Sequence, residues 1–271
     1  MRAYRAIFSA RFRVLLQYRL AAAAGFGTQL FWGLIKVMIF EAFYEAATKG
    51  PMPMRFEEVV AYVWLGQATL AALPWNVDRE LAAMIRGGGV LYELLRPVDL
   101  YNQWFCRTLA LRTAPTLMRA APMFVTATAI LPLLGAERWA LATPTPAALA
   151  GWVAVMLGAI VLGVAMTTIW NISMMWTLSS EGATHLAPAL VTIFSGMVIP
   201  LPLFPDWAQG ALRLSPFAGL LDLPARVFIG HIAPQDVGGV LLQQLGWAFV
   251  LVVVGRWMLR RGVRQLVVQG G

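Results

Sequence analysis

The sequence predicts an all-α integral membrane protein with six transmembrane helices. Of its 271 residues, 59% are hydrophobic and only 13% are charged, and the mean hydropathy is +0.69. An average soluble domain carries about a quarter charged residues, so this chain lacks the polar surface that a soluble protein of its length needs. The composition therefore excludes an ordinary soluble domain and a disordered chain.

Six intervals are long and apolar enough to be considered as membrane crossings. A helix needs about 20 apolar residues to cross the hydrocarbon core. Pro144 and Pro146 place the start of the fourth crossing near residue 147, and the short charge-free interval 120–136 requires the third to begin earlier. The predicted spans are residues 20–44, 59–77, 114–136, 147–175, 184–203 and 237–258.

The basic residues are distributed unevenly between the loops. With the N-terminus inside, 15 arginines fall on cytoplasmic segments and five lysine or arginine residues on outer segments. Because short cytoplasmic loops carry the excess of basic residues, both termini are predicted in the cytoplasm. The net charge of +8 is then explained by membrane orientation, without nucleic-acid binding.

Residues 1–18 are predicted to form an amphipathic helix at the membrane interface. An apolar stripe with arginines opposite it is typical of a helix in the headgroup plane, although Arg11 breaks the pattern. The alternative is a plain cytoplasmic extension. The stripe is Ala3, Ile7, Ala10 and Val14, and the opposing arginines are Arg2, Arg5 and Arg13.

Residues 78–100 are predicted to form two short amphipathic helices on the cytoplasmic side. Gly87, Gly88 and Gly89 separate them, because three glycines end a helix. Such a pair offers a surface to a soluble partner, and the alternative is a connector lying flat on lipid. The first apolar stripe is Val77, Leu81, Met84 and Ile85, and the second is Leu91, Leu94, Leu95 and Val98.

The outer connection, residues 204–236, contains apolar pieces too short to cross and bracketed by prolines. Such pieces favour re-entrant or interfacial elements packed on protein. The alternative is a folded outer loop with no part in transport.

Lys36 is the most informative single residue within a predicted span, because an intramembrane ammonium is costly and marks a functional candidate. The alternative is that its side chain extends to the outer interface, near Glu41. No Cys/His cluster has metal-ligand spacing, and no phosphate-binding GxxxxGK[ST] pattern occurs. The candidates for a substrate path, which ordinary helix packing would equally explain, are Trp32, Lys36, Asn171, Met174, Met175 and Pro200.

Several short motifs occur in a specific order along these spans. They are Ile85-Arg-Gly, Leu91-Tyr-Glu-Leu-Leu-Arg-Pro, Ser195-Gly-Met-Val-Ile-Pro-Leu with Phe204-Pro, Ser215-Pro-Phe with Pro224 and Gly230, and Arg260-Arg-Gly-Val-Arg near the C-terminus. With these motifs the chain resembles the ABC-2 type exporter permeases, in particular a bacterial branch formerly catalogued as a domain of unknown function.

The resemblance implies a single transmembrane permease domain, residues 1–271, of an ATP-binding cassette exporter in the bacterial plasma membrane. It implies an N-terminal elbow helix, a cytoplasmic coupling helix and an outer re-entrant segment. Two cytoplasmic ATPase subunits would bind ATP and Mg²⁺, and a second permease, identical or homologous, would complete the transporter. The chain itself would hold no cofactor. The implied ATPase-coupling residues are Asp78, Arg79, Glu80, Arg86, Leu91, Tyr92, Glu93, Leu94, Leu95 and Arg96.

The expected activity is export of a hydrophobic or amphipathic substrate, such as a drug-like compound, a lipid or a peptide. Membrane lipids are further expected partners. Two alternatives stay open: a membrane-embedded enzyme, and a membrane assembly subunit without transport. The enzyme predicts paired acids, a His–acid pair or a GxSxG-like site within the spans, and the sequence shows none of these.

Overall fold

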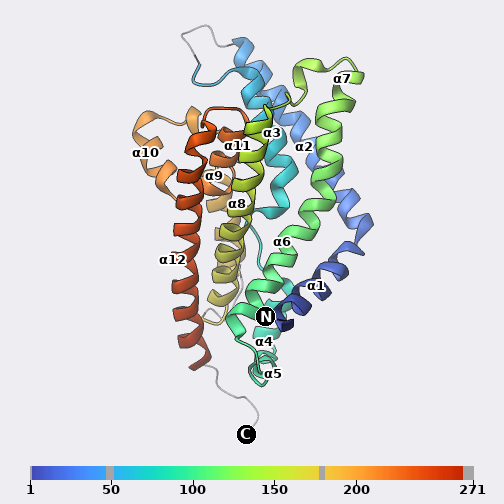
Figure 1. Cartoon of the computed structure of the whole chain (residues 1–271). Coiled ribbons are helices and arrows are strands. Elements are labelled where there is room, and N and C mark those ends of the chain that lie inside the picture. The colour runs from blue at the N-terminus through green and yellow to red at the C-terminus, as the bar shows by residue number, and fades with distance from the viewer. Residues whose placement is uncertain (1, 47–51, 177–180, 265–271) are drawn as a thin grey trace.

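The computed structural model describes residues 2–46, 52–176 and 181–264, with only the backbone for 181–185 (Figure 1). The described residues form helices and turns, without a strand, which confirms the all-α prediction. The α-helices are α1 (Arg2–Leu16), α2 (Arg19–Ala46), α3 (Phe56–Thr69), α4 (Arg79–Arg86), α5 (Val90–Leu94), α6 (Leu100–Val125), α7 (Leu131–Leu133), α8 (Pro146–Ser173), α9 (Glu181–Phe194), α10 (Asp206–Leu214), α11 (Asp222–Phe228) and α12 (Val237–Arg264).

Within the described part of the chain, four helical stretches are long and apolar enough to cross a membrane. They are residues 19–46, 100–133, 146–173 and 234–264. The second consists of α6, a π-helical turn (Thr126–Ile130) and α7, and the fourth includes the 3₁₀ turn Pro234–Asp236 before α12. The chain is thus a multi-pass membrane protein by the length and composition of its helices.

The helices within the second and fifth predicted spans are shorter than the sequence predicts. Helix α3 has 14 residues and is followed by the 3₁₀ turn Leu70–Ala72, whereas the prediction extends to residue 77. Helix α9 also has 14 residues, and beyond it Gly196 adopts a φ of 84°, which suits glycine. Fourteen residues rise only about 21 Å, less than the roughly 30 Å of a hydrocarbon core. Six crossings therefore stay a prediction.

Helix α6 begins 14 residues before the predicted start of the third span, residue 114. Asp99 caps it, since its carboxylate accepts a hydrogen bond from the backbone N–H of Asn102 at 2.9 Å. Charge-free length does not reveal this start, because the helix carries three arginines within its first 20 residues. Arg107, Arg112 and Arg119, counted above as cytoplasmic, all lie within α6.

Helix α3 occupies the centre of the bundle, between α2, α6 and α11 (Figure 1). Trp64 is fully buried, and its Nε1 donates to the backbone carbonyl of Trp139 at 2.7 Å. Gly33 of α2 faces this indole so closely that a Cβ atom there would lie 2.6 Å from the ring. The bond to Trp139 and the glycine together fix how α2 packs on α3.

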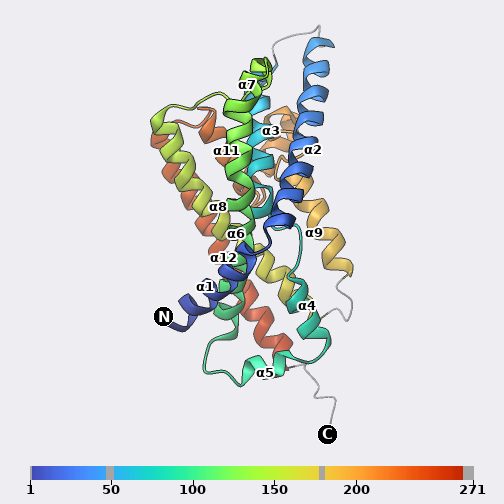
Figure 2. The ribbon, with the colours of Figure 1, turned by 90° about the vertical axis from the view of Figure 1, so that its right-hand side faces the viewer.

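Helices α1, α4 and α5 and the C-terminal end of α12 lie at one end of the molecule (Figure 2). Leu81 of α4 and Val90, at the start of α5, are buried there in one cluster with Trp104, Ile172 and Leu259. The predicted coupling segment, residues 78–100, therefore packs against the ends of α6, α8 and α12.

Candidate functional site

The N-terminal end of α4 is anchored to two long helices. Asp78 caps α4, and its carboxylate accepts hydrogen bonds from the backbone N–H groups of Glu80 (3.0 Å) and Leu81 (3.4 Å). The backbone N–H of Asp78 donates to Oδ1 of Asn171 on α8 at 2.9 Å. Nδ2 of Asn171 donates in turn to Oγ1 of Thr108 on α6 at 3.4 Å. The start of α4 is therefore coupled to both α6 and α8.

Helix α5 carries a buried carboxylate. Glu93 accepts hydrogen bonds from Nε1 of Trp104 (2.7 Å) and Nε2 of Gln103 (3.0 Å), both on α6. A buried carboxylate is stable only when it is hydrogen-bonded and paired with a cation, and Nη1 of Arg107 lies 3.5 Å from Oε1 of Glu93. Glu93 is thus turned into the protein, although the resemblance placed it among the residues that meet the ATPase.

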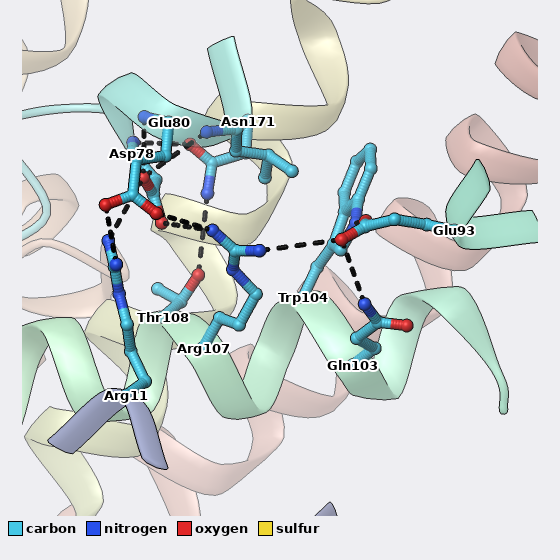
Figure 3. A network of polar contacts seen from close by, with 10 residues as sticks. Arg11, Asp78, Glu80, Glu93, Gln103, Trp104, Arg107, Thr108 and Asn171 are labelled. Carbon is cyan, nitrogen blue, oxygen red and sulfur yellow. Dashed lines mark hydrogen bonds and ion pairs between the residues drawn. The ribbon is translucent and has the colours of Figure 1, made fainter. Parts of the chain in front are cut away.

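Arg107 joins both short helices to α6. Its Nη2 lies 3.2 Å from Oε2 of Glu80 and 3.9 Å from Oδ2 of Asp78, while its Nη1 approaches Glu93 (Figure 3). A planar guanidinium presents donors in several directions at once. One side chain of α6 therefore contacts acids of α4, α5 and the cap that precedes α4.

Helix α1 enters the same site through Arg11 (Figure 3). Nη1 of Arg11 lies 2.6 Å from Oε1 of Glu80, and its Nη2 lies 3.7 Å from Oδ1 of Asp78. These contacts explain why Arg11 departs from the amphipathic pattern of residues 1–18: it faces α4, whereas Arg2, Arg5 and Arg13 are exposed.

The polar network, defined as Arg11, Asp78, Glu80, Glu93 and Arg107, contains three carboxylates and two guanidinium groups. Asp78 and Glu93 are buried, and Oδ2 of Asp78 has no hydrogen-bond partner among the described residues. Interactions between charges in a buried setting are stronger than in water, and an incompletely paired group there is costly. The network therefore binds α1, α4, α5 and α6 together and is sensitive to their relative positions.

A further arginine lies deeper in the bundle beside this network. Arg112 of α6 is buried, and its Nε donates to Oγ1 of Thr167 on α8 at 3.1 Å. Its Nη2 donates to the backbone carbonyl of Asn76, in the connection that leads to α4. Arg112 thus fixes the chain just before the cap at Asp78.

The opposite face of α5 is exposed and apolar. Tyr92 and Leu95 expose 75% and 82% of their surface, and Leu94 is also exposed. Arg96, which directly follows Leu95, is exposed as well. Exposed large apolar side chains rimmed by charge are typical of a protein–protein contact. A partner can therefore reach this face of the segment, whereas the acids Asp78 and Glu93 are buried.

The structure separates the six substrate-path candidates into two groups. Asn171, Met174 and Met175 lie at the end of α8 near the polar network, where Met174 is buried against Val77. Trp32 and Lys36 lie on α2, and Pro200 lies between α9 and α10, close in sequence to Met197, which Lys36 contacts. The structure thus does not bring all six to one path.

Lys36 contacts the turn that follows α9 rather than Glu41. Its Nζ donates to the backbone carbonyl of Met197 at 2.8 Å. Glu41 instead accepts a hydrogen bond from Nε1 of Trp139 at 2.9 Å and lies 3.1 Å from Arg138. Lys36 therefore links α2 to the turn that contains Gly196.

A third buried acid, Asp222, lies at the other end of the molecule. Asp222, at the start of α11, accepts a hydrogen bond from the hydroxyl of Tyr62 on α3 at 2.9 Å. Nη1 of Arg226 lies 3.8 Å from its other oxygen. Burial raises the pKa of Asp222 to about 6, an effect that Arg226 and the Tyr62 hydrogen bond oppose only in part. The pair ties the outer connection to the central helix α3.

A pocket of about 220 Å³ lies at the same end, between the start of α3, residues 142–148 and the end of α11. Glu58 lines it, paired with Arg55 at 2.9 Å, and Nε2 of His231 approaches Glu58 at 3.2 Å. In the part of the chain that the structure describes, no group of three or more His, Cys, Asp or Glu residues could hold a metal ion.

Sequence reasoning missed five residues that hold the site together: Arg11, Gln103, Trp104, Arg107 and Thr108. The acids within residues 78–93 were one available signal, because any of them that is buried needs a basic partner. The spacing of α6 alone does not say which of its side chains face the segment.

Comparison with known proteins agrees with this architecture. A profile of the ABC-2 family transporter proteins matches residues 55–270, which include every helix from α3 onward. Comparison with curated proteins yields no match, and neither does comparison with solved structures. On the profile match, which covers most of its length, the chain belongs to the ABC-2 transporter family of membrane proteins.

Proposed function

We propose that this chain is the permease subunit of an ATP-binding cassette exporter and that α5 is the element on which its ATPase docks. The observation that carries the proposal is the two-sided character of α5. Its outer face exposes Tyr92 and Leu95, while its inner face buries Glu93 against α6. Family membership implies partnership with an ATP-binding subunit, and this helix offers that subunit an apolar surface backed by charges.

The proposed assembly contains two copies of the ATPase, which bind ATP and Mg²⁺, and a second permease, identical or homologous. The chain crosses a bacterial inner membrane six times with both termini in the cytoplasm. The clustering of α1, α4, α5 and the arginine-rich end of α12 at one end supports this orientation (Figure 1). The substrate is hydrophobic or amphipathic and leaves the cytoplasm.

In this mechanism, movement of the docked ATPase displaces α5 and reaches α6 through Glu93 and its partners Gln103 and Trp104. Arg107 transmits the same displacement to α4, and Arg11 transmits it to α1. Because packed charges have discrete favourable arrangements, the network favours one of two packings of the long helices. ATP binding selects between them through the docked partner.

The test is reconstitution of the purified chain in liposomes with its cognate Walker-motif ATPase. Leu95→Ser removes an apolar group that is 82% exposed directly after α5. The matched control Trp207→Ser removes one that is 86% exposed on α10, at the other end. We expect Leu95→Ser to weaken co-purification and lower the ATPase activity of the complex by roughly tenfold, as for a residue central to a contact. The control should retain both.

The same preparation separates the alternatives. Loss of a fluorescent amphipathic dye from the liposome lumen or its leaflet should require ATP and the ATPase. Nucleotide turnover by the chain alone would indicate an enzyme, and ATPase binding without any dye movement would indicate an assembly subunit. Either result, or equal behaviour of Leu95→Ser and Trp207→Ser, would overturn the proposal.

A further inference from the structure

A groove lies between α1 and the first turns of α6. It has a volume of about 290 Å³ and is lined by Tyr4, Arg5, Asn102, Phe105 and Cys106. Phe105 and Cys106 provide an apolar wall on α6, and Arg5 is exposed at the edge of α1. The groove is separate from the polar network and from the exposed face of α5.

Each polar side chain in this groove has a donor group to offer. In Tyr4 and Asn102, the acceptor oxygen of the same side chain already accepts a hydrogen bond from another residue. The hydroxyl oxygen of Tyr4 accepts from the backbone N–H of Asp99 at 3.0 Å, so its O–H is left to donate. Oδ1 of Asn102 accepts from Nη2 of Arg256 at 2.7 Å, so its NH₂ group is left to donate. The guanidinium of Arg5 has only donors. Three of the residues that line this mainly apolar groove thus carry donors, a combination that suits an anion with an apolar part.

The surroundings specify the kind of anion. Arg2, Arg5 and Arg13 are exposed along α1. Arg256 lies beside Asn102 and pairs with the carboxylate of Asp99 at 3.5 Å. The arginines around the groove therefore outnumber this one acid. Basic interfacial helices attract anionic lipid headgroups. A free phosphate would gain nothing from the wall of Phe105 and Cys106, whereas a phospholipid places its glycerol and first methylenes there.

We propose that this groove binds one anionic phospholipid, with its phosphate against Arg5, Tyr4 and Asn102 and its glycerol backbone against Phe105 and Cys106. The bound lipid fills the space between α1 and α6 beside the polar network. The inference does not depend on the transport function, because it rests on the donors and the apolar wall alone.

Cys106 is the only cysteine in the chain and reports directly on occupancy of the groove. The experiment measures the rate at which a water-soluble maleimide labels Cys106 in nanodiscs of phosphatidylglycerol or phosphatidylcholine. We expect labelling to be roughly fivefold slower in phosphatidylglycerol, the effect of one arginine at an anionic surface. Arg5→Gln should abolish this difference, while Arg2→Gln, on the same exposed face but outside the groove, should retain it.

Three outcomes would overturn the inference. Equal labelling rates in the two lipids would remove the anionic preference, and an unchanged preference in Arg5→Gln would place the anion elsewhere. Protection by soluble glycerol phosphate in phosphatidylcholine discs as strong as that by phosphatidylglycerol would identify a free anion instead of a lipid. An unchanged rate for Arg5→Gln in phosphatidylcholine confirms that the groove is intact.

Discussion

At the residue scale, the Glu93–Arg107 pair gives the sharpest test of the site, because replacing one carboxylate oxygen of Glu93 by an amide nitrogen disturbs its contacts. Each oxygen of Glu93 accepts a hydrogen bond from α6, and Arg107 supplies the compensating charge. A neutral amide cannot replace this arrangement, since one of its two ends is itself a donor. The donors to both oxygens and the guanidinium of Arg107 therefore all favour the ionised carboxylate of Glu93.

Glu93→Gln should therefore destabilise the protein. One amide end would face a donor of Gln103 or Trp104, and Arg107 would lose a charged partner. Removing one member of a buried ion pair costs about 3–5 kcal/mol, and we expect the loss to lie near the lower end because Arg107 keeps Glu80. Thermal unfolding in detergent, followed by tryptophan fluorescence, measures the change.

The control for this substitution is Glu137→Gln, because Glu137 is exposed at the other end of the molecule and has no ion pair among the described contacts. It should leave the unfolding temperature within a degree or so of the wild type. If Glu93→Gln behaved in the same way, Glu93 would not be the buried, paired group described above.

Asp222 predicts a pH dependence of stability. Folding raises its pKa from 3.8 to about 6, because burial disfavours the charged form. The protonated carboxyl therefore stabilises the fold; this contribution is complete below about pH 4 and is lost as the pH rises through 6. A shift of this size corresponds to roughly 2–3 kcal/mol. Asp222→Asn should remove the dependence, because the amide stays neutral.

The measurement for Asp222 is the unfolding temperature of wild type and Asp222→Asn between pH 4 and pH 7.5. The difference, wild type minus variant, should fall as the pH rises through 6. The charged groups that act on Asp222 are Arg226 and Arg213, and neither changes charge in this range. A constant difference would show that Asp222 is ionised throughout.

At the scale of elements, the sequence predicted α4, α5 and their separation, because apolar periodicity and three consecutive glycines are local signals. It placed the start of α6 incorrectly, since charged residues hide a helix from a search for apolar length. The helices within the second and fifth predicted spans end before those spans do. Composition alone does not show where a helix within an apolar interval unwinds, as α3 does beyond Thr69.

The sequence predicts the exposed apolar face of the candidate site but not its buried polar face. The sequence predicted that Leu94 and Leu95 belong to a surface offered to a partner, and both are exposed in the structure. Glu93 looks equally available from its spacing, but α6 buries it. Which polar residues turn inward is decided by distant partners. Arg11 lies 67 residues before the buried Asp78 that it approaches, and pairings over that distance leave no local pattern.

The contact between α2 and α3 allows a test of packing with a matched control on one helix. A Cβ at Gly33 would lie 2.6 Å from the ring of Trp64, which its bond to Trp139 holds in place. Gly33→Val should therefore force α2 away from α3 and cost about 1–3 kcal/mol. Gly27→Val, where no atom lies within 4 Å of the added Cβ, should cost little. Unfolding temperatures in detergent compare them, and equal losses would contradict the proposed close approach.

At the scale of the whole molecule, the chain passes repeatedly between two ends (Figures 1 and 2). One end collects α1, α4, α5 and the last turns of α12, and the other collects α7, α10 and α11. Four passages are made by the long helices, and that the short helices α3 and α9 make two more is a prediction. A short helix can complete a crossing only if neighbouring protein satisfies the polar backbone that continues beyond it. Arg112, which donates to the carbonyl of Asn76, does this for the chain below α3.

Whether α3 completes a crossing can be decided by which side of the membrane its flanking residues face. In a Cys106→Ser background, single cysteines replace the exposed residues Arg55, before α3, and Arg79, at the start of α4. In intact cells a membrane-impermeant maleimide should label Arg55→Cys but not Arg79→Cys, and both should react after permeabilisation. Trp207→Cys, beyond α9, should be labelled like Arg55→Cys. Labelling of Arg55→Cys and Arg79→Cys from one side would show that α3 turns back within the membrane, because a segment that enters and leaves through one face keeps both flanks in one compartment.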